Sequence, residues 1–162
     1  MEKEPSFERD PIFERKVAKD IQEVLNEIKT ELGCEKPIIL YGSYSRGTDT
    51  SESDLDLSVP WDSENPAKWI QYVEKLVAKM KERGYKFDHK IEDPNVPYDI
   101  EFKSPDLMLA DRISGRMYNN QEKVYIFTLT GVTIFDFASE EKKWQQQYPK
   151  FYDELVQKRK QK

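Results

Sequence analysis

Residues 41–57 read Tyr-Gly-Ser-Tyr-Ser-Arg-Gly-Thr-Asp-Thr-Ser-Glu-Ser-Asp-Leu-Asp-Leu, and this run joins two short apolar segments of the chain. The first segment, Pro37–Tyr41, predicts a strand, and the Gly-Ser pair after it predicts a tight turn. Gly42 has no Cβ, so the backbone there can come close to a phosphate. Ser43 adds a hydroxyl and an N–H donor at the same place, and Arg46 adds positive charge. No Gly-Lys-Ser/Thr follows, so this turn is not a Walker-type phosphate loop.

Two carboxylates follow the turn, in Asp54-Leu-Asp56, with ten residues between Ser43 and Asp54. Successive side chains of a strand point to opposite faces, so the two acids should share one face while the leucines enter the core. Asp is depleted in strands, so the pair calls for an explanation beyond a polar surface turn and a half-exposed strand. Mg2+ takes oxygen ligands and is commonly bound by one or two carboxylates plus substrate phosphates. Together with the Gly-Ser turn, the pair favours metal-dependent chemistry on a triphosphate.

The segment Leu40–Leu57 resembles the signature of the DNA polymerase β-type nucleotidyltransferases, Gly-Ser followed by Asp-x-Asp. Its ten-residue gap is similar to that of the minimal nucleotidyltransferases, a small prokaryotic branch. Many of these are the antitoxin half of HEPN/MNT toxin-antitoxin modules. Similar motifs occur in antibiotic, tRNA and poly(A) nucleotidyltransferases. The resemblance implies an α/β fold, a mixed β-sheet flanked by helices, of the polymerase β palm type.

The family takes a third carboxylate from a later strand, and Val96-Pro-Tyr-Asp-Ile-Glu-Phe102 offers candidates. Apolar and acidic residues alternate in this stretch, so Asp99 and Glu101 are expected on the face opposite the core. Asp99 is favoured because Tyr-Asp-Ile-Glu-Phe resembles the Asp-Ile-x-Phe form of that strand in the family. Glu101 is the alternative, and an ordinary amphipathic edge strand is the plain structural reading. The apolar positions expected to face the core are Tyr98, Ile100 and Phe102.

The resemblance implies an enzyme that uses two divalent ions, Mg2+ or Mn2+, and an NTP, with ATP as the expected donor. Asp54 and Asp56 would bind both ions, and Gly42 and Ser43 would hold the phosphates. Asp99 would hold the second ion and act as general base on the acceptor hydroxyl. An in-line attack on the α-phosphorus would then release pyrophosphate. The predicted reaction is transfer of NMP, as AMP from ATP, to a hydroxyl.

The acceptor is open at this stage. Resemblance to the HEPN/MNT antitoxins implies a HEPN-like partner protein whose tyrosine would be modified, and self-modification is another option. A small antibiotic nucleotidyltransferase is an alternative enzyme, although such enzymes usually carry an extra helical domain and only Ser139–Lys162 is available here. An RNA-tailing enzyme would need more chain and a basic groove. A non-catalytic module that keeps the fold and binds a partner is the alternative from another class, and the intact motif argues against it.

Composition and charge argue against several other classes of protein, including membrane proteins and proteins with a large nucleic-acid interface. No apolar run approaches the roughly 20 residues that span a bilayer, and the N-terminus lacks an apolar signal core, so a soluble cytoplasmic protein without a membrane partner is expected. The net charge of −5 disfavours a large nucleic-acid footprint, while the basic tail Gln157–Lys162 leaves a local contact open. Cys34 and His89 are the only residues of their types, which argues against cysteine-rich metal sites and Ser-His-Asp hydrolases.

The chain is expected to form one nucleotidyltransferase domain over residues 1–162, because no segment reads as a linker. Pro149 should kink or interrupt the last helix. The aromatic residues of that helix predict packing on the core or on a second chain; they are Trp144, Tyr148, Phe151 and Tyr152. Residues 1–9 are expected to form a flexible arm. Helices are predicted from Asp10-Pro11 to Gly33, from Pro66 to near Gly84, over 105–117 and over about 139–160. Strands are predicted at Asp54–Val59, Val124–Thr128 and Val132–Phe137.

Overall fold

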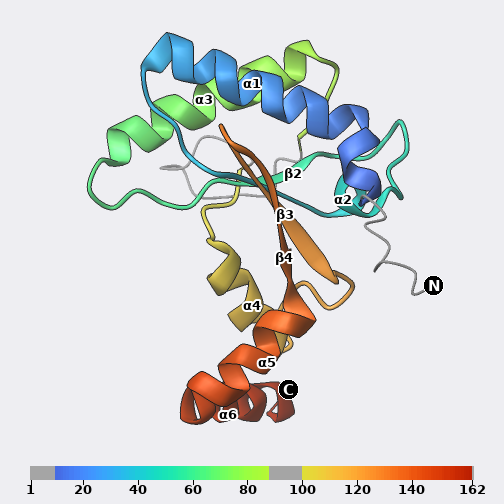
Figure 1. The fold of residues 1–162 in the computed structure, drawn as a ribbon, viewed down its shortest axis with the longest axis vertical. Helices are drawn as coiled ribbons and strands as arrows, with labels where there is room; N and C mark the ends of the chain where they lie inside the picture. The colour runs from blue at the N-terminus through green and yellow to red at the C-terminus, as the bar shows by residue number, and fades with distance from the viewer. Residues whose placement is uncertain (1–9, 88–99, 162) are drawn as a thin grey trace, which may run out of the picture.

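The computed structural model describes residues 10–87 and 100–161, and Figure 1 shows how their helices and strands are arranged. None of the helices in this part of the chain is both long and apolar enough to cross a membrane. In chain order the elements are η1 Pro11–Glu14, α1 Lys16–Leu32, β1 Ile38–Tyr41, α2 Ser43–Arg46, β2 Asp56–Ser58, α3 Pro66–Glu82, α4 Pro105–Ile113, β3 Lys123–Thr128, β4 Gly131–Asp136, α5 Phe137–Gln147 and α6 Pro149–Lys160.

Four strands form one sheet in the order β2-β1-β3-β4, and each neighbouring pair is antiparallel. Two parallel bridges extend the sheet beyond β2, one between Asp54 and Lys86 and one between Ser58 and Glu101. The expected mixed sheet flanked by helices is therefore confirmed. The second predicted strand is shorter than expected, because Asp54 belongs to an isolated bridge and β2 begins at Asp56.

The two faces of the sheet are covered by different helices, as Figure 1 shows. The alternation of a strand explains why: Ile38 and Leu40 join the larger buried cluster with α1 and α3, whereas Ile39 joins a smaller one with α4, α5 and α6. In β3, Phe127 belongs to the first cluster and Val124 to the second. The central strands thus carry a core on each side, and the segment after β1 lies between the two helical layers.

Helix α3 begins where the sequence predicts, at Pro66. The Asn65 side chain accepts a hydrogen bond from the Lys68 N–H, and Pro66 occupies the first helical position, where it needs no donor. Trp69 is fully buried, and its indole Nε1 donates to the Val59 carbonyl at 2.9 Å. This bond fastens α3 to the chain that leaves β2.

A buried acid joins α1 to the end of α3. Asp20 accepts hydrogen bonds from Lys16, Arg83 and the hydroxyl of Tyr85, and it is 7% exposed. Burial alone would raise the pKa of Asp20, but these three donors outweigh it and hold the pKa below its ordinary value of 3.8. Asp20 is therefore a structural carboxylate, outside the candidate site.

The first helix differs from its prediction at the N-terminus. A 3-10 turn, η1, comes first, Arg15 is extended with φ −81° and ψ 143°, and α1 begins at Lys16. The Arg15 guanidinium donates from Nη1 to the carbonyls of Tyr44 and Ser45, at 2.9 and 3.2 Å. These contacts with the segment after β1 explain why the chain leaves helical geometry at Arg15.

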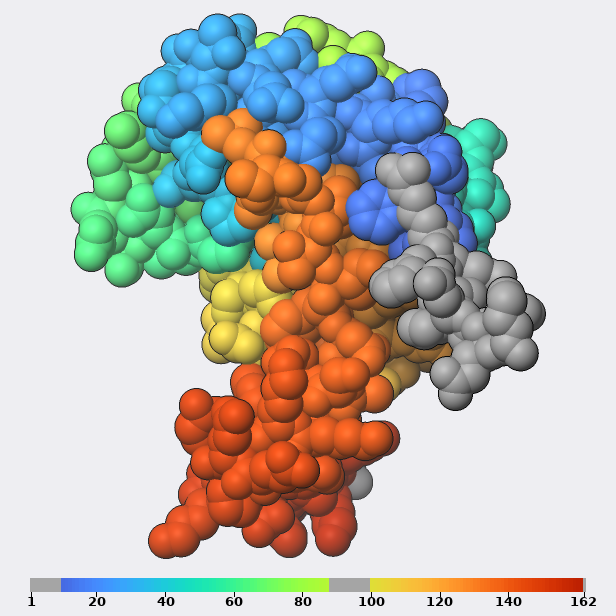
Figure 2. Space-filling view, viewed as in Figure 1, coloured from blue at the N-terminus to red at the C-terminus, as the bar shows by residue number. Residues whose placement is uncertain are grey.

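The C-terminal helix expected over about 139–160 is two helices, α5 and α6, which meet at Tyr148. A helical conformation is disfavoured for the residue before a proline, and Tyr148 has φ −135° and ψ 57°, so Pro149 interrupts the helix. Trp144 packs against the smaller cluster, whereas Tyr148 and Phe151 are 55% and 46% exposed. Figure 2 shows the α5–α6 layer projecting from the body of the molecule.

Candidate functional site

The Gly-Ser turn and the acidic strand are in direct contact. Tyr41 at the end of β1 lies opposite Asp56 of β2, so the next residue, Gly42, passes beside the Asp56 side chain. Gly42 has φ +75°, and a Cβ placed on it would lie 2.0 Å from Asp56 Oδ2. Position 42 therefore requires glycine both for its left-handed φ and for this close approach.

A single helical turn, α2, follows Gly42. The Gly42 carbonyl accepts hydrogen bonds from the Ser45 N–H at 3.0 Å and from Ser45 Oγ at 2.6 Å. At the other end, the Arg15 bonds to Tyr44 and Ser45 described above satisfy two carbonyls of the turn. Amides at the start of a helical turn have no acceptor within that turn, and the Ser43 N–H is at this position in α2.

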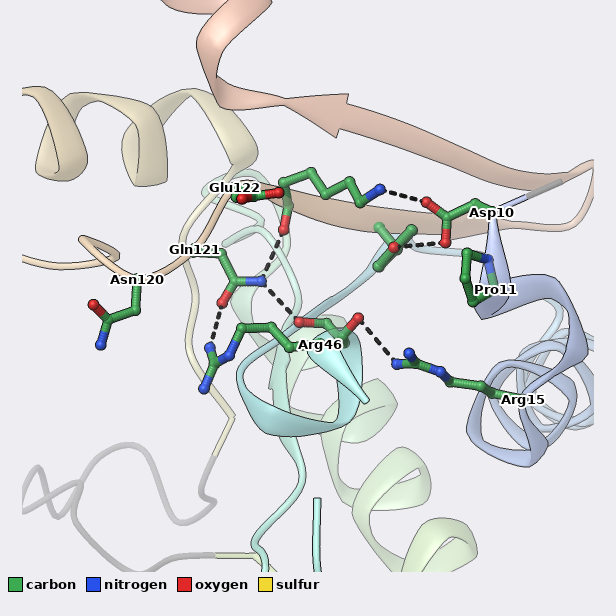
Figure 3. Close-up of a pocket in the computed structure, with 10 residues that line it drawn as sticks. Asp10, Pro11, Arg15, Arg46, Asn120, Gln121 and Glu122 are labelled. Carbon is green, nitrogen blue, oxygen red and sulfur yellow. Dashed lines mark hydrogen bonds and ion pairs between the residues drawn. The ribbon is translucent and has the colours of Figure 1, made fainter. Parts of the chain in front are cut away.

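A residue that the sequence did not mark, Gln121, holds this turn in place (Figure 3). Its Oε1 accepts from the Gly42 N–H at 3.1 Å and from Arg46 Nη1 at 3.0 Å. Its Nε2 donates to Ser45 Oγ and to the Lys123 carbonyl, both at 2.8 Å. Gln121 is 4% exposed, and all four bonds are to residues that β3 or α2 position. One side chain thus links the turn after β1 to the start of β3.

A hollow of about 350 Å³ lies beside this network, and Figure 3 shows the residues that line it. Arg46, Asn120 and Gln121 line both this hollow and the acidic pocket described next. On its far side, Asp10 accepts hydrogen bonds from Lys123 Nζ and the Tyr125 hydroxyl, at 2.6 and 2.8 Å. Burial would raise the pKa of Asp10, but hydrogen bonds from Lys123 and its neighbours hold it below its ordinary value. One ion pair, Asp10–Lys123, thus lies on the side of this hollow away from the turn.

The predicted site residues of the turn and the acidic strand line one pocket of about 570 Å³. The leucines between the acids are buried, as the alternation predicts, so Asp54 and Asp56 face the pocket while Leu55 and Leu57 enter the core. The backbone of this strand is fixed next to Asp54, because the Leu55 N–H donates to the Lys86 carbonyl at 2.7 Å. The full lining is Tyr41, Gly42, Ser43, Arg46, Ser53, Asp54, Asp56, Met117, Tyr118, Asn119, Asn120 and Gln121.

The favoured third carboxylate, Asp99, lies outside the described residues. The alternative, Glu101, lies across from Ser58: its N–H donates to the Leu57 carbonyl at 3.1 Å and its carbonyl accepts from Val59 at 2.9 Å. Within residues 10–87 and 100–161, no three carboxylate, histidine or cysteine side chains are grouped closely enough to hold a metal ion.

The prediction that the apolar residues of Val96–Phe102 face the core is correct for Ile100 and wrong for Phe102. Ile100 is fully buried, whereas Phe102 is 44% exposed. The Phe102 carbonyl accepts a hydrogen bond from the Trp61 N–H at 3.1 Å, so its backbone still pairs with the chain that follows β2. Its side chain nevertheless lies where the chain leaves the sheet toward α4, beyond the cover of the core.

Two tyrosines share the negative field of the carboxylates. Burial raises the pKa of Tyr41, and the charges of Asp56 and Glu101 raise it further. Burial likewise raises the pKa of Tyr118, with the charges of Glu101, Asp111 and Asp56 acting in the same direction. The two rings meet edge to face with centroids 5.7 Å apart. Both hydroxyls therefore stay protonated, and Glu101 lies within electrostatic reach of the same groups as Asp56.

The arginines of α4 and the segment after it are not part of the pocket lining. The Arg112 guanidinium lies over the Phe137 ring, 5.6 Å from its centroid, and Arg116 is exposed. Arg46 is the arginine that the structure brings to the pocket.

The strand–turn–strand unit, with its glycine against a carboxylate, is typical of a nucleotidyltransferase. The sequence profile of the family described as "Nucleotidyltransferase domain" matches residues 21–107, just over half of the chain, so the chain belongs to this family. A relative in Methanocaldococcus jannaschii, named "Putative protein adenylyltransferase", is 36% identical over 93 residues, which cover 53% of this chain and 93% of the relative. No solved structure matches the chain significantly.

The family, the fold and the relative agree with the resemblance noted from the motif. The chain is a nucleotidyltransferase of the polymerase β-like superfamily, with the features of its minimal branch. Enzymes of this family transfer a nucleoside monophosphate from an NTP.

Proposed function

We propose that this enzyme transfers AMP from ATP to a hydroxyl acceptor in a reaction that depends on a divalent metal. The observation that carries the proposal is the pocket in which Gly42, Ser43 and Arg46 face Asp54 and Asp56. A phosphate-binding turn and a carboxylate pair are the two components that phosphoryl chemistry needs side by side. The name of the archaeal relative, an adenylyltransferase, supports ATP as the donor.

The donor set fits Mg2+ or Mn2+. Both pocket carboxylates supply hard oxygen ligands, and a site with one or two carboxylates leaves coordination positions for water and phosphate oxygens. Asp54 and Asp56 would hold two ions together with a third carboxylate, Asp99 or its alternative Glu101. When bound, the ions would neutralise charge on the triphosphate and on the departing pyrophosphate.

The residues of the pocket would bind the triphosphate, orient the reacting groups and deprotonate the acceptor hydroxyl. The Ser43 N–H and hydroxyl would bind the terminal phosphates, and the Arg46 guanidinium would add positive charge beside them. Gly42 would let the phosphates and Asp56 approach the same stretch of backbone. The third carboxylate would accept the proton of the acceptor hydroxyl, whose oxygen would form a bond to the α-phosphorus as the bond to pyrophosphate breaks. The gain in rate would come from holding these groups in line and from stabilising the charge that develops on the phosphates.

The acceptor that we propose is a tyrosine hydroxyl of a HEPN-like partner protein. Support comes from the motif spacing shared with the minimal nucleotidyltransferases and from the words "protein adenylyltransferase" in the name of the relative. Incubation with ATP labelled at the α-phosphate tests this step. Label on a partner protein supports the proposal, whereas label on this chain alone indicates self-modification. Label on an added aminoglycoside or lincosamide and on no protein overturns the choice of acceptor.

Calorimetric titration of ATP and the other NTPs, with and without Mg2+, tests the site itself. We expect metal-dependent ATP binding that Asp54→Asn and Asp56→Asn abolish. Asp49→Asn is the matched control, because Asp49 is an exposed acid in the same loop and does not line the pocket. If no NTP binds the wild-type protein under either condition, the chain is not an autonomous transferase.

A pair of variants identifies the third carboxylate. If Asp99 is the general base, Asp99→Asn abolishes transfer of labelled AMP while ATP binding persists, and Glu101→Gln retains most of the activity. The reverse result assigns the role to Glu101. Full activity in both variants refutes a third carboxylate from this stretch.

A further inference from the structure

The acidic pocket has two walls of different chemistry. One wall carries the turn and the acids, including Ser43, Arg46 and Asp56, and is charged. The other wall is formed by residues 117–121, whose side chains are a thioether, a phenol and three amides, without a formal charge. At about 570 Å³ the pocket lies within the range that encloses a whole small-molecule ligand, so it has room for more than the phosphates.

The uncharged wall is a tight turn whose position is fixed at both ends. The Gln121 N–H donates to the Tyr118 carbonyl at 3.1 Å, which makes Asn119 and Asn120 the central residues of a four-residue turn. Tyr118 is the one non-glycine residue with positive φ in the described part of the chain, at 65°. Its ring packs on Tyr41, so the wall is attached to β1 at one end and to the turn after β1 through Gln121 at the other.

The two asparagine side chains are exposed at this wall. Neither makes a hydrogen bond with residues 10–87 or 100–161, and Figure 3 shows the Asn120 amide apart from the bonded group around Gln121. Asparagine is common in turns, so the turn alone does not indicate a ligand. The position of this turn does indicate a ligand, because both asparagine amides line the pocket that also holds the carboxylates. Met117, 40% exposed, adds an apolar surface beside them.

A second polar group behind this wall lacks a partner. The Tyr118 hydroxyl is buried and has no hydrogen bond within the residues that the structure describes. Buried polar atoms are almost always paired, and the exceptions need an explanation such as a ligand or water. The left-handed backbone of Tyr118 costs free energy as well, and such strain is concentrated at binding sites.

An amide side chain presents a donor and an acceptor together, which matches the amino group and ring nitrogen on one edge of adenine. We propose that Met117–Asn120 is the nucleoside subsite of the pocket and that the amides of Asn119 and Asn120 bind the edge of an adenine base. The subsite rests on the proposed transfer from ATP, since the base lies beyond the phosphates that the turn would hold.

The test measures dissociation constants for ATP, ITP and inorganic tripolyphosphate in Mg2+ by calorimetry. ITP replaces the amino group of the base with a carbonyl, and tripolyphosphate lacks the nucleoside. The wild-type protein should bind ATP at least about fivefold more tightly than ITP, as one lost amide–base pair implies. The double variant Asn119→Ala/Asn120→Ala should lose this preference and keep its affinity for tripolyphosphate. Asn26→Ala, which changes an exposed asparagine on α1, is the matched control and should leave all three constants unchanged.

The outcomes separate the subsite from the proposed function. If the double variant keeps the ATP preference, or if the wild-type protein binds ATP and ITP equally, the subsite is refuted while nucleotide binding stands. If the wild-type protein binds tripolyphosphate as tightly as ATP, the nucleoside makes no contribution and the subsite is again refuted. If none of the three ligands binds in Mg2+, the subsite and the proposed function are both overturned. Unchanged tripolyphosphate affinity in the double variant also shows that the variant is folded around an intact turn.

Discussion

Replacing Gln121 with methionine removes one side-chain amide and keeps almost the same volume. Three of its four hydrogen bonds join neutral groups at or near the core: those with the Gly42 N–H, Ser45 Oγ and the Lys123 carbonyl. At a net contribution of about 1 kcal/mol for each bond, Gln121→Met should lower the free energy of unfolding by about 3 kcal/mol. The bond from Arg46 adds little, because Arg46 is exposed.

Urea denaturation followed by circular dichroism measures this loss. Gln22→Met is the matched control, since Gln22 is a half-buried glutamine whose side chain donates one hydrogen bond, from Nε2 to the Thr128 carbonyl at 2.7 Å. The control should cost about 1 kcal/mol. Gln121→Met should also weaken ATP binding, because the turn from Gly42 to Arg46 loses its link to β3, and the control should not.

The reasoning is refuted if the two variants differ by less than about 0.5 kcal/mol, the size of an ordinary surface effect. It is also refuted if Gln121→Met binds ATP as tightly as the wild-type protein does. In that case the turn holds its geometry without the amide, and Gln121 contributes only to stability.

Three further outcomes are expected. Gly42→Ala should abolish metal-dependent ATP binding, because its Cβ would displace the Asp56 carboxylate. The control is Gly84→Ala, since Gly84 has φ +95° and nothing lies within 4 Å of a new Cβ there. This control should cost roughly 1 kcal/mol of unfolding free energy and leave ATP binding intact. Asp20→Asn should lower the unfolding free energy at pH 7. The folded-state pKa of Asp20 is depressed, so the carboxylate contributes stability at pH values above its ordinary pKa of 3.8. In a series of denaturation curves, the difference in unfolding free energy between the variant and the wild-type protein should close as the pH falls through the folded-state pKa. A gap that widens on acidification contradicts this sign. Trp69→Phe should cost more than the about 1–3 kcal/mol of an unpaired buried carbonyl, because the smaller ring also leaves a cavity in a fully buried site. A loss below about 0.5 kcal/mol in urea denaturation contradicts both contributions.

Local features of the sequence predict much of this fold. Three features each act over a few residues, so they can be recognised without the rest of the chain. They are the alternation around Asp54 and Asp56, the proline at the start of α3, and the Gly-Ser turn. Gln121 could not be found in this way. It lies 79 residues from Gly42 in sequence, and nothing in a single glutamine before an apolar strand indicates that it will cap a distant turn.

Two departures from prediction, at Arg15 and Phe102, also depend on parts of the chain outside the local pattern. The helical spacing before Lys16 is real, but contacts with a distant turn draw Arg15 out of the helix. Alternation placed Phe102 in the core, and its exposure depends on where the chain turns away from the sheet. Arg15 owes its conformation to a partner that is far away in sequence, and Phe102 owes its exposure to the path of the chain beyond the strand; a local pattern encodes neither.

The pairing of β1 with β3 means that the sheet extends beyond the segment that matches the family. Residues 21–107 include β1 and β2, yet the partner on the other side of β1 comes from Lys123–Thr128. A chain cut at the family boundary would expose the unpaired backbone of β1 as a free sheet edge, open to pairing with another chain. Transplanting the Gly-Ser turn and the Asp-x-Asp pair into another scaffold therefore calls for a strand in the place of β3, because that strand pairs with the other side of β1.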